Sequence, residues 1–156
     1  EMASGQPRLD IHSVDPEAQQ AVFAMERYVR DSGLDPKLYE LVKIRASQLN
    51  GCAFCLDMHN RDARNAGEDQ RRLDVLSAWR EAPELFTDQE RAAFAFTEAV
   101  TRIGEAGVPD TVWSGIEAQF DQAAIVHLLI AVATINVWNR LAVATHQQLP
   151  DPAATS

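Results

Sequence analysis

Apolar residues recur every three or four positions along most of this chain, which is the spacing of one face of an α-helix. The pattern predicts a first helix from Asp15-Pro16 to Ser32-Gly33 and a second from Asp35-Pro36 to Asn50-Gly51. In both, an aspartate can cap the N-terminus, and a proline takes the first helical position, where its missing N–H costs nothing. Glycine readily adopts the left-handed conformation that ends many helices, so Gly51 should separate the second helix from a third.

The same reasoning divides the rest of the chain into helices. Thr87 and Glu90 have the spacing of a capping box, and Asp110 and Asp121 are expected to cap the last two helices. The remaining helices are expected at residues 52–65, 68–79, 87–104, 110–120 and 123–147. No stretch alternates with a period of two, and neither a glycine-rich phosphate loop nor an internal repeat is present. The sequence therefore predicts an all-α, single-domain bundle of about seven helices.

The ends of the chain lie outside this helical pattern. We expect an N-terminal arm over residues 1–14, a helical domain over 15–148 and a C-terminal tail over 149–156. Within the arm, residues 6–14 lack periodicity and should be extended, and Glu1–Gly5 is interpreted as a tag or processing remnant. No signal peptide is visible.

The most apolar run, residues 123–137, belongs to the last helix. His127, Thr134 and Asn136 interrupt the run, which falls short of the roughly 18 to 20 unbroken apolar residues that a membrane span needs. We therefore expect a buried central or inter-subunit helix and no membrane partner.

Composition narrows the class of protein further. At 156 residues and 46% hydrophobic, the chain can bury a sizeable core as one globular domain. Its net charge of −9, from 23 acidic and 14 basic residues, argues against nucleic acid or an anionic membrane as the main partner. Arg61, Arg64, Arg71 and Arg72 alternate with acidic residues and should form a solvated face. The two cysteines, three positions apart, suggest a cytoplasmic redox or metal pair rather than a structural bridge.

Candidate chemistry is concentrated where the third helix should begin. Cys52, Cys55 and His59 fall on one helical face over two turns. The free N–H groups and the positive end of the helix dipole favour thiolate over thiol in the first turn, where a cysteine pKa of about 8.5 can fall by one to several units. An imidazole one turn away can accept a thiol proton, so these three residues could form a nucleophilic site.

Glu40 joins this group if the two helices fold back on each other at Gly51. At about 1.5 Å per residue, Glu40 lies roughly 16 Å down one helix, and His59 lies roughly 12 Å down the other. Cys55 lies only about 6 Å down the same helix as His59. Glu40 should thus reach His59 before it reaches a sulfur atom. Carboxylate, imidazole and thiol in that order make a proton relay.

At these positions the chain resembles a known family. Glu40, eleven intervening residues, then Cys52-x-x-Cys55-x-x-x-His59 is similar to the signature of the AhpD-like alkylhydroperoxidases, within the carboxymuconolactone decarboxylase family. The resemblance continues through two further segments and covers residues 15 to 145. These segments are Thr87–Ala92 and Asn136–Arg140. The resemblance implies an all-helical fold, assembly into trimers or hexamers, and thiol-dependent reduction of hydroperoxides.

The resemblance also implies a role for each site residue. Cys55 would be the peroxidatic thiol, Cys52 the resolving thiol, His59 the base and Glu40 the relay acid. Phe54 is a departure, because the best-known members carry a histidine directly before the second cysteine, and the proton network is one group short. The helix argument alone favours Cys52 as the more acidic thiol, so the two sulfur roles follow from the resemblance.

The expected function is therefore that of a thiol peroxidase or disulfide oxidoreductase. Its partners would be a hydroperoxide substrate and an external dithiol donor, either a protein or a carrier such as lipoamide. No metal, flavin or nucleotide cofactor is expected. Two other classes stay open: a lactone decarboxylase on the same scaffold, and a non-enzymatic redox sensor or assembly module that forms the disulfide without turnover.

Each candidate residue also has a structural interpretation. The cysteines could be small buried hydrophobic residues, or could bind zinc with His59 if His12, His127 or His146 supplied a fourth ligand through the fold. Glu40 could pair with Lys43 on an exposed helix face. We expect His127 to lie in the core and the tryptophans to serve packing. Asn136, Asn139 and Arg140 could brace an interface or line a pocket.

Overall fold

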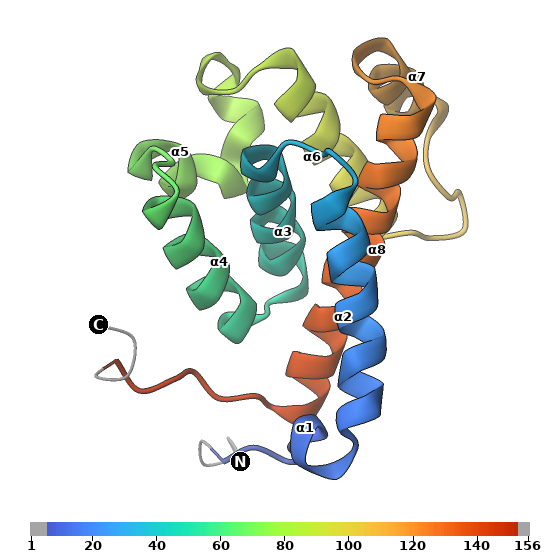
Figure 1. Cartoon of the computed structure of the whole chain (residues 1–156). Helices are drawn as coiled ribbons and strands as arrows, with labels where there is room; N and C mark the ends of the chain where they lie inside the picture. Colours follow the sequence, from blue (N-terminus) through green and yellow to red (C-terminus); the bar gives the residue numbers. More distant parts are fainter. Residues whose placement is uncertain (1–5, 153–156) are drawn as a thin grey trace.

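The computed structural model describes residues 6–152, and within this part of the chain it consists of helices and connecting turns, with no β-strand (Figure 1). The α-helices are α1 (Ile11–Val14), α2 (Pro16–Asp31), α3 (Pro36–Asn50), α4 (Ala53–Asn65), α5 (Gln70–Val75), α6 (Asp88–Thr101), α7 (Asp110–Gln119) and α8 (Gln122–Thr145). Two 3₁₀ helices, η1 (Leu76–Glu81) and η2 (Pro83–Leu85), lie between α5 and α6. The prediction of an all-α domain is confirmed, with eight α-helices in the described residues where about seven were expected.

The additional helix is α1, which lies in a segment that the sequence predicted to be extended. Asp10 caps it by accepting a hydrogen bond from the backbone N–H of His12 at 3.1 Å. Just before it, the backbone N–H of Arg8 donates to the carbonyl of Thr145 at 2.8 Å, so this end of the chain runs alongside the end of α8. The expected remnant, residues 1–5, lies outside the described residues.

The predicted signals at the ends of α2, α3 and α6 are confirmed. Asp15 and Asp35 accept hydrogen bonds from backbone N–H groups of the first turns, and Thr87 forms the full capping box with Glu90. Gly51 ends α3 in the left-handed conformation, with φ of 65° and ψ of 36°, and α4 begins two residues later. One detail differs: Asp110 is the first residue of α7, and Pro109 precedes it without a side-chain cap.

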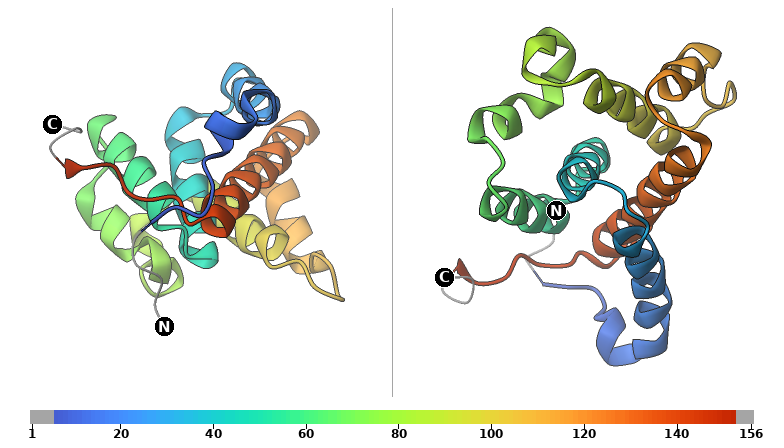
Figure 2. Two further views of the ribbon diagram at one scale, coloured as in Figure 1. Left: turned by 90° about the horizontal axis from the view of Figure 1, so that it is seen from below. Right: turned by 45° about the horizontal axis from the view of Figure 1, so that its top comes forward.

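The centre of the molecule is α3 rather than α8. The second view of Figure 2 shows α3 surrounded by α4, α5, α6 and α8, and it packs against α4, α6 and α8. Its buried residues run almost without a gap from Leu38 to Ser47 and therefore occupy every side of the helix. Leu38 and Val42 belong to a core shared with α2, α6 and α8, whereas Leu41 and Ile44 belong to a second core towards α4, α5 and η1. Packing on both sides fixes the position of α3.

The most apolar helix, α8, lies beside this centre and packs against α2, α3 and α6. It is long and apolar enough to cross a membrane by length and composition, with a mean hydropathy of 1.5, contrary to the expectation from its interrupted run. One such helix is weak evidence for a membrane span, because the core helices of soluble proteins meet the same criteria. Only 39% of its most apolar window is buried inside the molecule, and Val126, Leu129 and Val143 are exposed on its outer side.

A polar network joins α8 to the C-terminal end of α3. The side-chain amide of Asn50 donates to the oxygens of Asn136 and Asn139, both at 2.9 Å. Asn139, which is fully buried, donates in turn to the hydroxyl of Ser47 at 3.0 Å. Asn136 also donates to the hydroxyl of Thr101 on α6 at 2.9 Å. These asparagines therefore brace contacts between helices of one chain, directly before the turn that leads to the cysteines.

Two aromatic residues lie nearer the surface than the sequence predicted. His127 is half-buried on α8, with its ring packed edge-on against Tyr28, so it is not a core histidine. Trp113 is 41% exposed, and its indole N–H donates to Glu117. A helix as apolar as α8 suggested complete burial of His127, but only one side of that helix faces the core.

Candidate active site

The two cysteines form a disulfide at the start of α4. Cys52 is the N-cap residue, and its sulfur accepts a hydrogen bond from the backbone N–H of Cys55 at 3.3 Å. The two residues are 1% and 2% exposed. A sulfur atom that accepts a backbone N–H at a helix N-terminus is in the setting that stabilises a thiolate once the disulfide is reduced.

The fold brings Glu40 of α3 next to His59 of α4. These helices run side by side from the turn at Gly51 (Figure 1), and Glu40 Oε2 lies 3.3 Å from His59 Nδ1. This contact has the distance of an ion pair, but its angles are not those of a hydrogen bond, and neither atom has another hydrogen-bond partner. The interaction is therefore electrostatic in this state, with the carboxylate directed at the imidazole.

A buried lysine lies on the other side of Glu40. Lys43 Nζ is 2.8 Å from Glu40 Oε1 and 3.6 Å from Glu26 Oε1, and its side chain is only 3% exposed. Tyr39 donates its hydroxyl to Glu26 at 2.7 Å. The sequence suggested a pair between Glu40 and Lys43 on a solvated helix face. The pair exists but is buried, because α3 is covered on all sides. The sequence reasoning missed Glu26 and Tyr39, whose only signal was a helical position.

This arrangement keeps Glu40 ionised. Burial by itself would raise the pKa of Glu40, but the neighbouring His59 and the Lys43 ammonium favour the carboxylate and together hold its pKa below the usual value. Burial and the nearby Glu26 raise the pKa of Tyr39, so its hydroxyl remains a hydrogen-bond donor. The site thus keeps a negative charge beside the imidazole at neutral pH.

Cys55 and His59 line one cavity of about 250 Å³. Most of its wall surface is apolar and comes from Phe23 of α2, Phe54 and Met58 of α4, and Trp138 of α8. Three charged side chains, Glu26, Arg30 and Asp62, also line it. Phe23 and Trp138 pack edge to face, with ring centroids 5.0 Å apart. The sequence suggested only packing for Trp138 and singled out neither Phe23 nor Met58, because their convergence depends on how α2 and α8 approach α4.

Cys52 faces another cavity, of about 240 Å³. This cavity is lined by residues of the α3–α4 turn and of the end of α8, among them Gly51, Ala142 and His146. Phe54 and Ala142 border both cavities. The two cysteines therefore line two neighbouring cavities, Cys55 the first and Cys52 the second.

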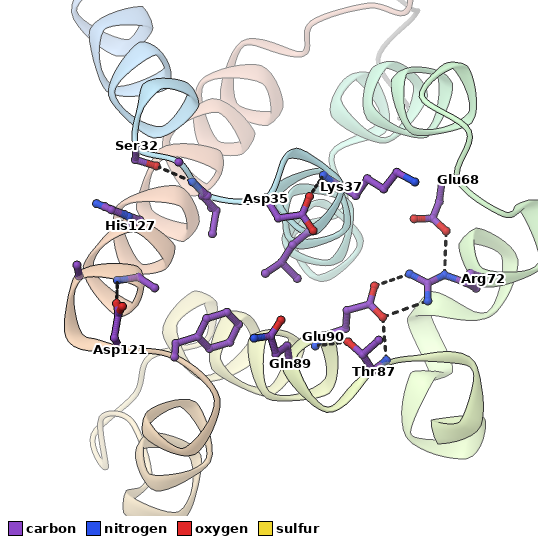
Figure 3. Close-up of a pocket in the computed structure, with 16 residues that line it drawn as sticks. Ser32, Asp35, Lys37, Glu68, Arg72, Thr87, Gln89, Glu90, Asp121 and His127 are labelled. Atoms are coloured by element: carbon purple, nitrogen blue, oxygen red, sulfur yellow. Dashed lines mark hydrogen bonds and ion pairs between the residues drawn. The ribbon is translucent and has the colours of Figure 1, made fainter.

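A larger cavity, of about 520 Å³, lies away from the sulfurs at the beginnings of α3, α6 and α8 (Figure 3). Its polar wall includes Arg72, whose guanidinium donates to Glu68 and to both carboxylate oxygens of Glu90. Arg72 thus braces α5 against α6 and does not belong to a solvated face, as the sequence had suggested. Arg72, Glu68 and Glu90 are thus paired with one another, and no thiol lines this cavity.

Metal-ligating side chains do not gather around the sulfurs. Within the described part of the chain, the one group of three such residues whose ligand atoms lie within 4.8 Å of one another is Glu40, His59 and Asp62. It includes neither cysteine, which gives no support to the zinc alternative built on the thiols.

Comparison with known proteins supports the family resemblance that the cysteine motif indicated. Residues 16–99 match the model of the carboxymuconolactone decarboxylase family. The uncharacterized protein YdfG of Bacillus subtilis is 37% identical over 137 residues, which cover 88% of this chain and 92% of YdfG. The uncharacterized protein YnjA of Escherichia coli is 30% identical over 106 residues, covering 68% of this chain and 57% of YnjA.

Solved structures share the fold. A protein of unknown function from Agrobacterium tumefaciens, for which an AhpD-type antioxidant defence role has been suggested, is 42% identical with a TM-score of 0.90, and the match covers 94% of this chain and 99% of that one. A peroxidase-related protein from Silicibacter is 23% identical with a TM-score of 0.76, covering 89% and 73% of the two chains. The debrominase Bmp8 is 18% identical with a TM-score of 0.77, covering 92% and 77%, and like the Silicibacter protein it supports the fold alone. The chain therefore belongs to the carboxymuconolactone decarboxylase family, as an AhpD-like member.

Proposed function

We propose that this protein is a thiol-dependent peroxidase that reduces organic hydroperoxides through Cys55 and Cys52. One observation carries the proposal: Cys55 and His59 line the same cavity, and the carboxylate of Glu40 lies 3.3 Å behind the imidazole. Family membership and the Agrobacterium neighbour support a peroxidase-like role in general terms. The residue roles and the substrate class are our inference.

The reaction starts from the reduced protein. Glu40 orients the imidazole of His59 and stabilises its positive charge, and His59 takes the proton of Cys55. The Cys55 thiolate attacks the distal oxygen of the hydroperoxide, the O–O bond breaks, and the proton held by His59 passes to the departing alkoxide. The products are an alcohol and a sulfenic acid on Cys55.

Cys52 then completes the cycle. Its thiol condenses with the sulfenic acid, releases water and forms the Cys52–Cys55 disulfide seen in the structure. An external dithiol reduces this disulfide by thiol–disulfide exchange and is itself oxidised. The separate cavities suit this order, because the hydroperoxide can approach Cys55 while the dithiol approaches Cys52.

The wall of the Cys55 cavity favours a substrate with an apolar body. Burial of apolar surface contributes about 25 cal/mol per Å², and hydrogen peroxide offers none. Phe54 supports this assignment, since it provides apolar surface where the best-known members have a histidine. We also propose a cytoplasmic homo-oligomer, a trimer or hexamer, with a protein dithiol or lipoamide as the reductant.

A peroxide assay with thiol counting tests the proposal. Fully reduced protein should lose two thiols per chain on reaction with one equivalent of cumene hydroperoxide, and should react faster with it than with hydrogen peroxide. Cys55→Ser should abolish the reaction, while Cys52→Ser should retain the first step and stop at the sulfenic acid. Two thiols that persist after peroxide treatment, or turnover by Cys55→Ser, would contradict the proposal.

The family description supplies a second candidate, a lactone decarboxylase. That chemistry gives no reason for a paired thiol, so a decarboxylase should keep its activity after both cysteines are alkylated. A redox sensor, in contrast, should form the disulfide once and show no multiple turnover when the reductant is supplied in excess.

A further inference from the structure

Glu40, His59 and Asp62 converge at the edge of the active site. Glu40 comes from α3, whereas His59 and Asp62 lie three residues apart and therefore project from the same side of α4. One ligand atom from each lies within 4.8 Å of the others. A carboxylate, an imidazole and a second carboxylate are ligands that zinc accepts.

The separation of the two inner atoms fits a shared metal ion. Two ligand atoms at about 2.05 Å from zinc, at a tetrahedral angle, lie about 3.3 to 3.4 Å apart. Glu40 Oε2 and His59 Nδ1 are 3.3 Å apart, without the alignment of a hydrogen bond. A direct N–H···O bond is typically shorter, about 2.9 Å. The separation of this pair fits a direct ion pair and also fits a cation held by both atoms.

The inner atoms also lack other partners. His59 is 7% exposed, and its Nδ1 has no hydrogen-bond partner, nor does Glu40 Oε2. Asp62 is exposed, and its carboxylate makes no hydrogen bond or ion pair in the described part of the chain, so it can rotate towards them. The positive charge of Lys43 opposes a cation here, but Lys43 binds the other oxygen of Glu40 and is partly neutralised by Glu26 at 3.6 Å.

We propose that Glu40, His59 and Asp62 form an inhibitory binding site for Zn²⁺, with water in the fourth position. A neutral imidazole that binds metal through Nδ1 carries its proton on Nε2 and cannot accept another. The bound ion therefore removes the base that activates Cys55. This inhibitory consequence rests on the proposed peroxidase function, whereas binding of the ion does not.

Zinc titration of the oxidised protein tests the site, because the thiols are then held in the disulfide. In competition with a zinc-binding dye, wild type should bind one ion per chain, and Asp62→Ala should weaken binding at least tenfold. Asp57→Ala is the matched control, since Asp57 is an exposed carboxylate of the same helix that pairs with Arg61 outside the cluster. Absence of binding at 100-fold excess of zinc over protein, or equal affinity in wild type and Asp62→Ala, would overturn the site.

Turnover with cumene hydroperoxide tests the inhibition. Asp62 also lines the Cys55 cavity, so each protein is compared with its own zinc-free rate, and Asp62→Ala should need at least tenfold more zinc for half-inhibition than wild type. Reduced thiols also bind zinc, but equally in the two proteins, so the difference reports on Asp62. Equal inhibition would refute the regulatory role, whereas a wild type without any peroxidase activity would refute the proposed function and leave the dye titration to decide the site.

Discussion

Lys43 illustrates how a single residue determines the electrostatics of the site. An ammonium group buried without a partner would be very costly, and Lys43 is buried only because Glu26 and Glu40 lie within ion-pair distance. The Lys43 ammonium favours the charged form of Glu40, whose carboxylate forms the ion-pair contact with the imidazole of His59. One residue thus links the packing of α3 to the chemistry of α4.

Glu40→Gln should slow the reaction of Cys55 with hydroperoxide by at least about tenfold, because the imidazole loses its charged partner. The pH dependence has a definite sign. The pKa of Glu40 lies below the usual 4.5, so the carboxylate remains ionised, and its support of His59 is lost only as the pH falls through that lowered value. Stopped-flow rates at pH 7 would measure the first effect, and a pH series extended well below pH 4.5 would measure the second.

Glu17→Gln is the control for this variant, as Glu17 is an exposed residue in the first turn of α2. Unfolding curves should show that Glu40→Gln remains folded, since Lys43 retains Glu26. A rate for Glu40→Gln equal to that of wild type would leave Glu40 with a structural role only.

The residues of the site were partly predictable. Glu40, Cys52, Cys55 and His59 follow from helical spacing and one glycine turn, because all four lie within a single pair of adjacent helices. Lys43, Phe23 and Trp138 could not be placed in this way. Their positions depend on contacts between helices distant in the sequence, and a periodic pattern does not record which face meets which partner.

At the scale of the helices, the asparagine network holds the end of α3 against α8. Asn139→Ala would leave the Ser47 hydroxyl without its donor and Asn50 with one acceptor fewer. We expect a loss of about 1 to 3 kcal/mol in the free energy of unfolding. Urea denaturation would measure it, with Asn65→Ala, an exposed residue at the end of α4, as the control. Equal stability of the two variants would show that the contacts of Asn139 contribute nothing.

Helix limits were predicted well where capping residues are present. Asp15-Pro16, Asp35-Pro36 and Gly51 set the ends of α2 and α3, because each satisfies backbone groups that the helix itself leaves free. Helix α1 was missed because four residues are too few to show a period. The segment from Glu68 to Trp79 was expected to be one helix and divides into α5 and η1, with non-helical dihedral angles at Ala78 inside η1.

For the whole molecule, the order of burial among the helices differs from the expectation. Hydropathy suggested α8 as the centre, but α3, which carries Lys43 and other polar residues, is the helix covered on all sides. Ion pairs and hydrogen bonds make that burial possible, and a hydropathy scale does not count them. The large apolar residues that α8 exposes are Val126, Leu129 and Val143.

These exposed residues lead to a prediction about assembly. Native mass spectrometry should show a trimer or hexamer, and Leu129→Glu should shift it towards the monomer, because a charge would enter an apolar contact. Glu117→Lys, on the exposed side of α7, is the control. A monomeric wild type would exclude the proposed assembly, and an oligomer unchanged by Leu129→Glu would locate the interface elsewhere.

The site draws on two separate parts of the chain. Every residue of the proposed redox reaction lies in the α3–α4 hairpin, whereas much of the cavity wall next to Cys55 comes from α2 and α8. Substitutions at Phe23 or Trp138 should therefore change which molecules enter without disturbing the groups that we propose transfer electrons and protons. Such a division allows one helical pair to be retained while the accepted oxidant diversifies, since selection can act on reactivity and on recognition independently.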